Sequence, residues 1–396
     1  MSSLVSPELL DRVRERLSRT SAQPSPAMVA AAIRAEASGV LGDTDLLDAL
    51  QVLQTELTGS GALEPLLAQP DVSDVLVTAP DQVWVDRGSG LERAPVRFAD
   101  EAAVRRLAQR LALAAGRRLD DAQPWVDGRL PAAAGAGFGV RLHAVLAPLA
   151  YGGTCVSLRV LRPATQGLDA LCSGGTVPAE ARELLVRIVA ARLAFLVVGG
   201  TGAGKTTLLA ALLAQVDRRE RIVCVEDAAE LAPTHPHVVR LVARAPNVEG
   251  VGEVTVRQLV RQALRMRPDR IVVGEVRGGE VVDLLTALNT GHDGGAGTVH
   301  ANSPEEVPAR LEALAALGGL DRAALHSQLA AAVQVVLHVH RAADGRRSLA
   351  QIGVLDRDER GQVGVLPAWT PTAESCPGAH RLADLLERRG VGVGSW

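Results

Sequence analysis

Residues 197–209, VVGGTGAGKTTLL, contain the spacing GxxxxGK[ST] of a phosphate-binding loop, with Gly199, Gly204, Lys205 and Thr206 at its fixed positions. An apolar strand-like run precedes the loop, and an apolar helix-like run follows it. Glycines let backbone N–H groups turn toward a polyphosphate, and the N-terminus of the following helix adds a partial positive charge. The Thr206 hydroxyl suits Mg²⁺. We expect ATP to be bound by Gly200, Thr201, Gly202, Ala203, Gly204, Lys205, Thr206 and Thr207.

The lysine of this segment is the only lysine in the chain; the other 41 of the 42 basic residues are arginines. A chain with this bias would replace a solvated surface lysine freely. A compact ammonium fits a narrow phosphate loop, whereas a planar guanidinium does not. The alternative, a glycine-rich strand–helix turn without a ligand, leaves the retention of Lys205 unexplained.

Two further apolar runs end in carboxylates. Residues 221–227, RIVCVED, end in Glu226 and Asp227, with Glu230 beyond, and residues 270–275, RIVVGE, end in Glu275, with Arg277 beyond. The carboxyl ends of parallel strands converge on the ligand crevice of a doubly wound sheet. One glutamate would then hold the metal and the other would orient the attacking water. The alternative is that both are solvated carboxylates where strands end.

Two histidines, His292 and His300, lie in the glycine-rich segment 289–302, NTGHDGGAGTVHAN. They could sense a γ-phosphate or form a metal pair. The metal pair is disfavoured because no third ligand is suitably spaced apart from Asp293. The close pairs His235/His237 and His338/His340 are interpreted as structural or surface residues, with metal binding as the alternative.

The elements that must position these residues fall into several segments, because 396 residues exceed one ordinary core. After residue 177 apolar strands alternate with helices, which predicts a largely parallel, buried sheet. Upstream, short strands around one helix, with Asp100 as its N-cap, predict a small α+β domain. Thr255/Gln258 and Ser303/Glu306 are predicted capping boxes. The expected boundaries are a helical segment 1–58, the α+β domain 59–163, a linker 164–176, the ATPase domain 177–345 and a C-terminal α/β tail 346–396.

Composition limits the partners. A net charge of -3 and 2% aromatic residues weigh against direct nucleic-acid binding. No apolar run is long enough to predict a transmembrane helix, and the N-terminus does not read as a signal peptide. The widely spaced cysteines exclude a tetracysteine zinc site and favour a reducing, cytoplasmic setting.

Four segments in order resemble the type II/type IV secretion traffic ATPases: GGTGAGKTT, RIVCVEDAAEL, ALRMRPDRIVVGEVRG and NTGHDGGAGTVHANSPEE. They look like the family's Walker A, Asp box, Walker B and His box. The upstream segments GALEPLL, VSDVLV, WVDGRLP, RLHAVLAPLA and VSLRVL are similar to one branch, the tight-adherence (Flp) pilus assembly ATPases of the CpaF/TadA type. The absence of a tetracysteine module argues against the type II secretion branch.

This resemblance implies a PAS-like N-terminal domain, a RecA-like P-loop NTPase motor and a homo-hexameric ring at the cytoplasmic face of an integral-membrane platform protein. It implies that Glu226 activates water, that Glu275 supports Mg²⁺ and that His300 contacts the nucleotide region. Arg141 and Arg159 align with arginines that reach phosphates, where they would stabilise developing charge. Without the resemblance, both would be ordinary strand-face arginines.

The leading prediction is therefore a hexameric ATPase that powers assembly of a Flp-type pilus or protein secretion across the cytoplasmic membrane. Two alternatives stay open. One is the ATPase of a DNA-transfer or DNA-uptake type IV secretion system. The other is a scaffold of such a machine that binds ATP without hydrolysing it.

Overall fold

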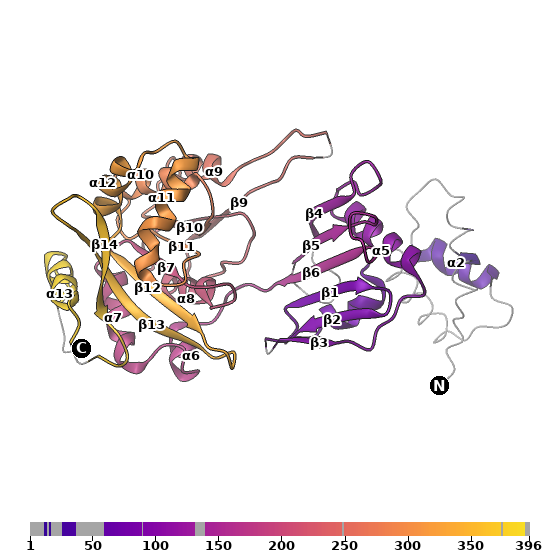
Figure 1. Cartoon of the computed structure of the whole chain (residues 1–396), viewed down its shortest axis with the longest axis horizontal. Coiled ribbons are helices and arrows are strands. Elements are labelled where there is room, and N and C mark those ends of the chain that lie inside the picture. Colours follow the sequence, from indigo (N-terminus) through magenta and orange to yellow (C-terminus); the bar gives the residue numbers. More distant parts are fainter. Residues whose placement is uncertain are drawn as a thin grey trace. The chain divides into compact units, whose positions relative to one another are not determined.

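The structure is a computed structural model that describes residues 12–13, 16, 26–36, 59–88, 90–130, 139–247, 249–373 and 375–392. The chain divides into two compact units, residues 1–161 and 162–396 (Figure 1). Most of the helical segment expected at 1–58 lies outside the described residues, and α2 (Pro26–Glu36) is described within it. Among the described helices, none combines the length and apolar character that crossing a bilayer requires.

The first unit is built on a six-stranded sheet in the order β3-β2-β1-β6-β5-β4. Its core is formed by alternate strand residues packed with α5, whose start is confirmed at Asp100: its side chain accepts from the Ala103 amide at 2.7 Å. The elements are η1 (Gly61–Leu63), α4 (Glu64–Leu67), β1 (Asp74–Ala79), β2 (Gln82–Asp86), β3 (Leu91–Arg93), α5 (Glu101–Ala114), β4 (Trp125–Leu130), β5 (Gly139–Val145) and β6 (Cys155–Leu161).

Strand β4 was not expected from the sequence. Its core-facing positions are Val126, Gly128 and Leu130, so a glycine interrupts the apolar alternation that predicts a strand. A Cβ at Gly128 would lie 2.9 Å from the Ala115 side chain at the end of α5. Close packing of the end of α5 on β4 therefore excludes any residue larger than glycine at position 128. The apolar alternation by which a strand is predicted is interrupted there.

The second unit has an eight-stranded sheet in the order β14-β13-β12-β7-β11-β10-β8-β9. The strands from β12 to β9 in this order are parallel to one another, which confirms the predicted largely parallel sheet. β13 pairs antiparallel with β12 and with β14. The strands are β7 (Phe195–Val198), β8 (Ile222–Glu226), β9 (Val238–Val242), β10 (Arg270–Val276), β11 (Ala296–Val299), β12 (Val335–Arg341), β13 (Arg347–Arg357) and β14 (Val363–Trp369).

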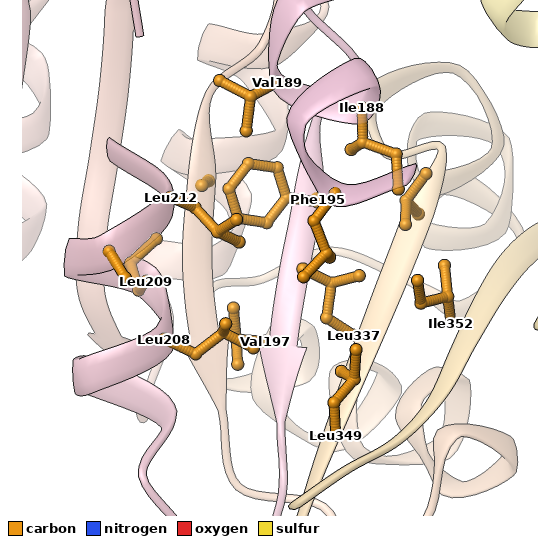
Figure 2. Close-up of a cluster of buried hydrophobic side chains, with 14 of the residues drawn as sticks. Ile188, Val189, Phe195, Val197, Leu208, Leu209, Leu212, Leu337, Leu349 and Ile352 are labelled. Carbon is orange, nitrogen blue, oxygen red and sulfur yellow. The ribbon is translucent and has the colours of Figure 1, made fainter. Parts of the chain in front are cut away.

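Helices cover both faces of this sheet. One face packs against α6 (Leu168–Ser173), α7 (Ala179–Ala190), α8 (Lys205–Leu213) and α13 (Ala379–Arg388). Figure 2 shows this core, where Leu208, Leu209 and Leu212 of α8 meet Phe195 and Val197 of β7. The other face packs against α9 (Val256–Ala263), α10 (Glu280–Leu288), η2 (Pro304–Glu306), α11 (Val307–Leu317) and α12 (Arg322–Ala332).

Residues 164–176, expected as a linker, contain α6, whose Leu168 and Leu171 are buried in the core of the second unit. Residues 346–396, expected as a tail, supply β13, β14 and α13 to the same unit. The Thr255/Gln258 capping box is confirmed.

The prediction of a Ser303/Glu306 capping box is wrong. A capping box needs the N-cap side chain to accept from the N3 amide. Here the Glu306 amide donates to the Ser303 carbonyl in a 3₁₀ turn, and the Glu306 carboxylate accepts from the Asn302 amide at 3.0 Å. In this tighter turn the Glu306 amide donates to the Ser303 carbonyl instead of to the Ser303 hydroxyl.

Candidate nucleotide-binding site

The phosphate loop connects β7 to α8 at the carboxyl end of the parallel sheet. Gly199, Gly202 and Gly204 have φ values of 152°, 70° and 98°, which side chains rarely adopt. A Cβ on Gly199 would also lie 2.2 Å from the Val339 carbonyl oxygen of β12. The first glycine of the motif is therefore required both by its backbone conformation and by the approach of a neighbouring strand.

Lys205 begins α8 and is buried, with 9% of its surface exposed. Its Nζ donates to the carbonyls of Gly199 at 3.0 Å and Gly200 at 2.9 Å, so the ammonium lies within the curve of the loop. Burial lowers the pKa of Lys205, and the carboxylates of Glu275 and Glu230 oppose that shift. The negative charges of Glu275 and Glu230 therefore favour the charged form of Lys205.

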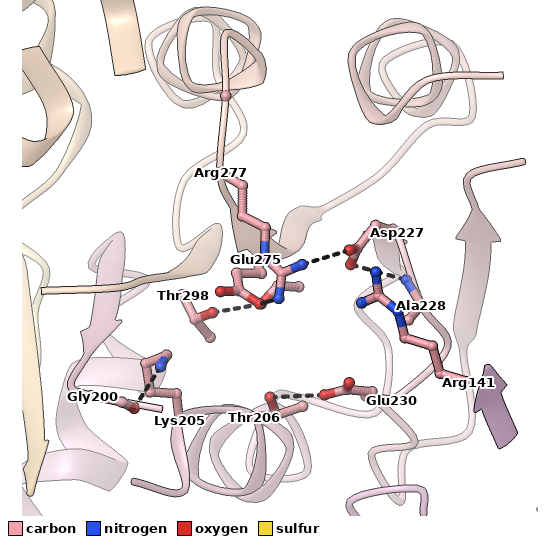
Figure 3. A network of polar contacts seen from close by, with 12 residues as sticks. Arg141, Gly200, Lys205, Thr206, Asp227, Ala228, Glu230, Glu275, Arg277 and Thr298 are labelled. Carbon is pink, nitrogen blue, oxygen red and sulfur yellow. Dashed lines mark hydrogen bonds and ion pairs between the residues drawn. The ribbon is translucent and has the colours of Figure 1, made fainter. Parts of the chain in front are cut away.

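Thr206, Glu230 and Glu275 bring oxygen ligands to the same region. The Thr206 hydroxyl donates to the Glu230 carboxylate at 3.4 Å. In Figure 3 the side chains of Lys205, Thr206, Glu230 and Glu275 surround one space. A hydroxyl and carboxylates are hard donors of the kind that Mg²⁺ prefers, so the residues present fit this ion.

Glu226 lies at the end of β8 and is buried. Its residue is 2% exposed, and one carboxylate oxygen accepts from the amides of Glu230 at 2.9 Å and Leu231 at 2.8 Å. The other oxygen lies 3.9 Å from Nε of Arg240. A Cβ on Gly274 would lie 2.7 Å from Cγ of Glu226, which shows how closely β10 covers it. Burial raises the pKa of Glu226, against the effect of the two amides.

Arg277 joins the carboxylates at the ends of two strands. Its guanidinium donates to Glu275 at 2.5 Å and to Asp227 at 3.1 Å (Figure 3). The Glu275 carboxylate is the main cause of the raised pKa of Arg277. A cavity of about 480 Å³ adjoins this bridge, and its lining includes Asp227, Glu275, Arg277, Arg257 and Leu317. The sequence drew attention to Arg277 only as the residue beyond Glu275.

His300 and His292 lie at opposite ends of β11. His300 directly follows the strand, which runs between β7 and β10, so it lies at the same sheet edge as the phosphate loop. His292 precedes the strand and approaches the Ala287 carbonyl at 3.1 Å through Nδ1. A four-residue strand separates them by more than 10 Å along the chain. The two therefore cannot form a metal pair, and of the two only His300 lies at the sheet edge that carries the phosphate loop.

The two candidate arginines of the first unit form a cross-strand pair. Arg141 on β5 lies directly opposite Arg159 on β6. Arg141 pairs with Asp127 at 2.8 Å, and Arg159 pairs with Asp74 at 2.8 Å. All four lie on the face of the sheet opposite to its core.

The strand register places a third arginine beside this pair. Arg129 of β4 lies directly opposite Arg141 on the same face. Sequence reasoning missed Arg129 because β4 itself was not predicted. A strand assigned to the segment WVDGRL would have placed Arg129 on the face shared by Trp125 and Asp127.

Comparisons with known proteins agree with the sequence motifs. Residues 56–376 match the family model described as "Type II/IV secretion system protein". A protein of Mycobacterium tuberculosis named "Putative conjugal transfer protein" is 71% identical over 350 residues, which cover 88% of this chain and 99% of that protein. "Type IV secretion system protein PtlH" of Bordetella pertussis is 34% identical over 274 residues, covering 63% of this chain and 78% of that protein.

A solved structure shares the fold. The structure titled "Crystal Structure of the Pilus Retraction Motor PilT and Bound ADP" matches with a TM-score of 0.51 and 19% sequence identity, over 83% of this chain and 85% of that chain.

Proposed function

Because the chain belongs to the type II/IV secretion system protein family, whose members are ATPases, we propose that it is a Mg²⁺-dependent ATP-hydrolysing motor of a type IV secretion machine that transfers DNA. The observation that supports hydrolysis is the placement of Lys205 in the phosphate loop with the charges of Glu275 and Glu230 nearby. The name of the Mycobacterium tuberculosis relative favours the DNA-transfer alternative over the leading prediction of pilus assembly. Membership of an ATPase family disfavours the scaffold that binds ATP without hydrolysing it.

The residue roles follow from which groups face the lysine. Gly200–Thr207 bind the phosphate chain, and Thr206 with Glu230 hold Mg²⁺, which supplies charge stabilisation to the transferring phosphoryl group. Glu275 orients the attacking water and is itself held by Arg277. This differs from the roles implied by the resemblance, because Glu226 is buried and one of its carboxylate oxygens accepts from two backbone amides. Glu226 is therefore a positioning residue for the turn that carries Glu230.

The remaining roles extend the family resemblance. His300 contacts the γ-phosphate region from the end of β11. Arg141 and Arg159 act as arginine fingers on the transferring phosphoryl group. The RecA-like motor and PAS-like domain assemble as a homo-hexamer on an integral-membrane platform at the cytoplasmic face. The net charge of -3 favours a ring that serves DNA transfer without binding DNA itself.

A second candidate, pilus assembly, is favoured by one observation. Segments that resemble the Flp branch, such as VSDVLV and VSLRVL, form the central strands β1 and β6 of the first sheet. A chromosomal Lys205→Ala substitution in the host strain separates the two candidates. We expect conjugal DNA transfer to fall to background while surface pili, counted by electron microscopy, persist. Loss of pili with DNA transfer intact would replace the main proposal by the second candidate.

A further inference from the structure

The β12–β13 hairpin places two arginines beside the phosphate loop. β12 runs parallel to β7, with His338 opposite Val198, and it continues past the end of β7 to Arg341. β13 starts at Arg347 and returns antiparallel, so that Arg347 pairs directly with Arg341. The tip of the hairpin therefore lies next to the loop into which β7 leads.

Both side chains touch the central glycines of the loop. Nε of Arg347 donates to the Gly202 carbonyl at 2.9 Å. A terminal guanidinium nitrogen of Arg341 would lie 3.1 Å from a Cβ built on Gly202, and Cδ of Arg347 would lie 3.3 Å from one built on Gly204. The absence of side chains at these two glycines thus lets the arginines approach the loop backbone.

The arrangement concentrates positive charge. Like charges directly opposite each other on antiparallel strands repel, and Arg341 and Arg347 are such a pair. The Lys205 ammonium and the N-terminus of α8 add to the same field. The carboxylate in the hairpin turn does not offset it locally, because Asp344 pairs with Arg346 at 2.7 Å. A polyanion in the loop could accept charge-assisted guanidinium–phosphate bonds from these arginines.

We propose that Arg341 and Arg347 form a cationic clamp on the phosphate chain of the bound nucleotide, supplied by the same unit that carries the phosphate loop. The inference rests on the proposed function, because it requires a nucleotide in the loop. The clamp binds the nucleotide before any charge develops, so it sets the affinity for ATP and ADP. Arg141 and Arg159, in contrast, are proposed to stabilise the charge that develops on the transferring phosphoryl group.

Calorimetric titration of the full chain with Mg·ADP at low and high KCl tests the clamp. We compare the wild type, the double variant Arg341→Gln/Arg347→Gln and the control Arg360→Gln, which removes an exposed arginine of the turn between β13 and β14 and leaves the Asp344–Arg346 pair in place. The double variant should bind ADP about 10-fold more weakly or worse at low salt, with a shallower dependence of Kd on KCl, because two screened charge contacts are lost. The control should stay within about twofold of wild type.

The outcomes separate the inference from the function on which it rests. If the double variant binds ADP within twofold of a binding-competent wild type, the clamp is overturned and the proposed function stands. Weaker binding with an unchanged salt dependence would also overturn it, because the arginines would then only support the loop backbone. A wild-type chain that binds no ADP would overturn the proposed function itself. Thermal unfolding of each variant confirms that the proteins compared are folded.

Discussion

Arg141 and Arg159 lie directly opposite each other on β5 and β6, and an aspartate holds each of them: Asp127 for Arg141 and Asp74 for Arg159. The carboxylates hold the two guanidinium groups side by side and balance their charge, so a phosphate that binds there must compete with Asp127 and Asp74. The pairing makes the two arginines one functional group, so we expect their substitutions to be non-additive.

Replacing either arginine by glutamine should lower kcat by roughly 1,000-fold, the scale of an arginine finger, with little change in ADP affinity. The double variant should be hardly slower than the single ones. Steady-state ATPase assays of the full chain measure this. Arg93→Gln is the matched control, since Arg93 is a strand arginine of the same sheet that pairs with Asp81 at 3.3 Å. If Arg141→Gln and Arg93→Gln retained equal activity, Arg141 would have only a structural role.

Lys205→Arg should be as inactive as Lys205→Ala, each losing roughly 100-fold or more in kcat. The Lys205 side chain is buried and ends between the carbonyls of Gly199 and Gly200, a space that suits an ammonium and not a planar fork. Single-turnover ATP hydrolysis provides the measurement. Near wild-type turnover by Lys205→Arg would show that the chain keeps its single lysine for another reason.

Glu275→Gln should lower kcat by roughly 100-fold with a nearly unchanged KM, because the change removes the charge that orients water and keeps the shape. Glu226→Gln should cost less than about 10-fold, since its carboxylate accepts from backbone amides and an amide oxygen can do the same. The two variants are each other's control in one ATPase assay. The opposite ranking would restore the roles implied by the family resemblance.

The stability of the chain should show the raised pKa of Glu226. A carboxyl whose pKa is raised on folding stabilises the protein fully below its unfolded pKa, and this contribution is lost as pH rises through the folded pKa. The Tm difference between Glu226→Gln and wild type should therefore shift in favour of the variant from about pH 4 upward. Glu359→Gln, at an exposed glutamate, is the control. A pH-independent Tm difference for Glu226→Gln would contradict a pKa raised by burial.

Gly199→Ala should destabilise the protein and abolish nucleotide binding. A backbone with φ of 152° costs roughly 1–3 kcal/mol for any residue with a Cβ, and the clash with the Val339 carbonyl adds to it. Gly200→Ala is the control for stability, because a Cβ there meets no atom within 4 Å. Thermal unfolding compares the two variants. Equal Tm values would mean that the Val339 carbonyl of β12 does not lie close enough to Gly199 to exclude a side chain there.

The sequence by itself determined the features that are local along the chain. The phosphate loop, the strand before it and the helix after it lie within about twenty consecutive residues, so spacing and hydrophobic pattern suffice to predict them. The same holds for the caps at Asp100 and Thr255, which depend on neighbours three residues away.

Only the tertiary structure decided which distant side chains face one another. Strand register placed Arg129 opposite Arg141 and brought Arg341 and Arg347 to the phosphate loop, and the approach of β10 buried the carboxylate of Glu226. In each case the decisive contact joins strands that lie far apart in sequence or a strand that the pattern hid. Register and burial depend on how whole elements pack, and no short window of sequence contains that information.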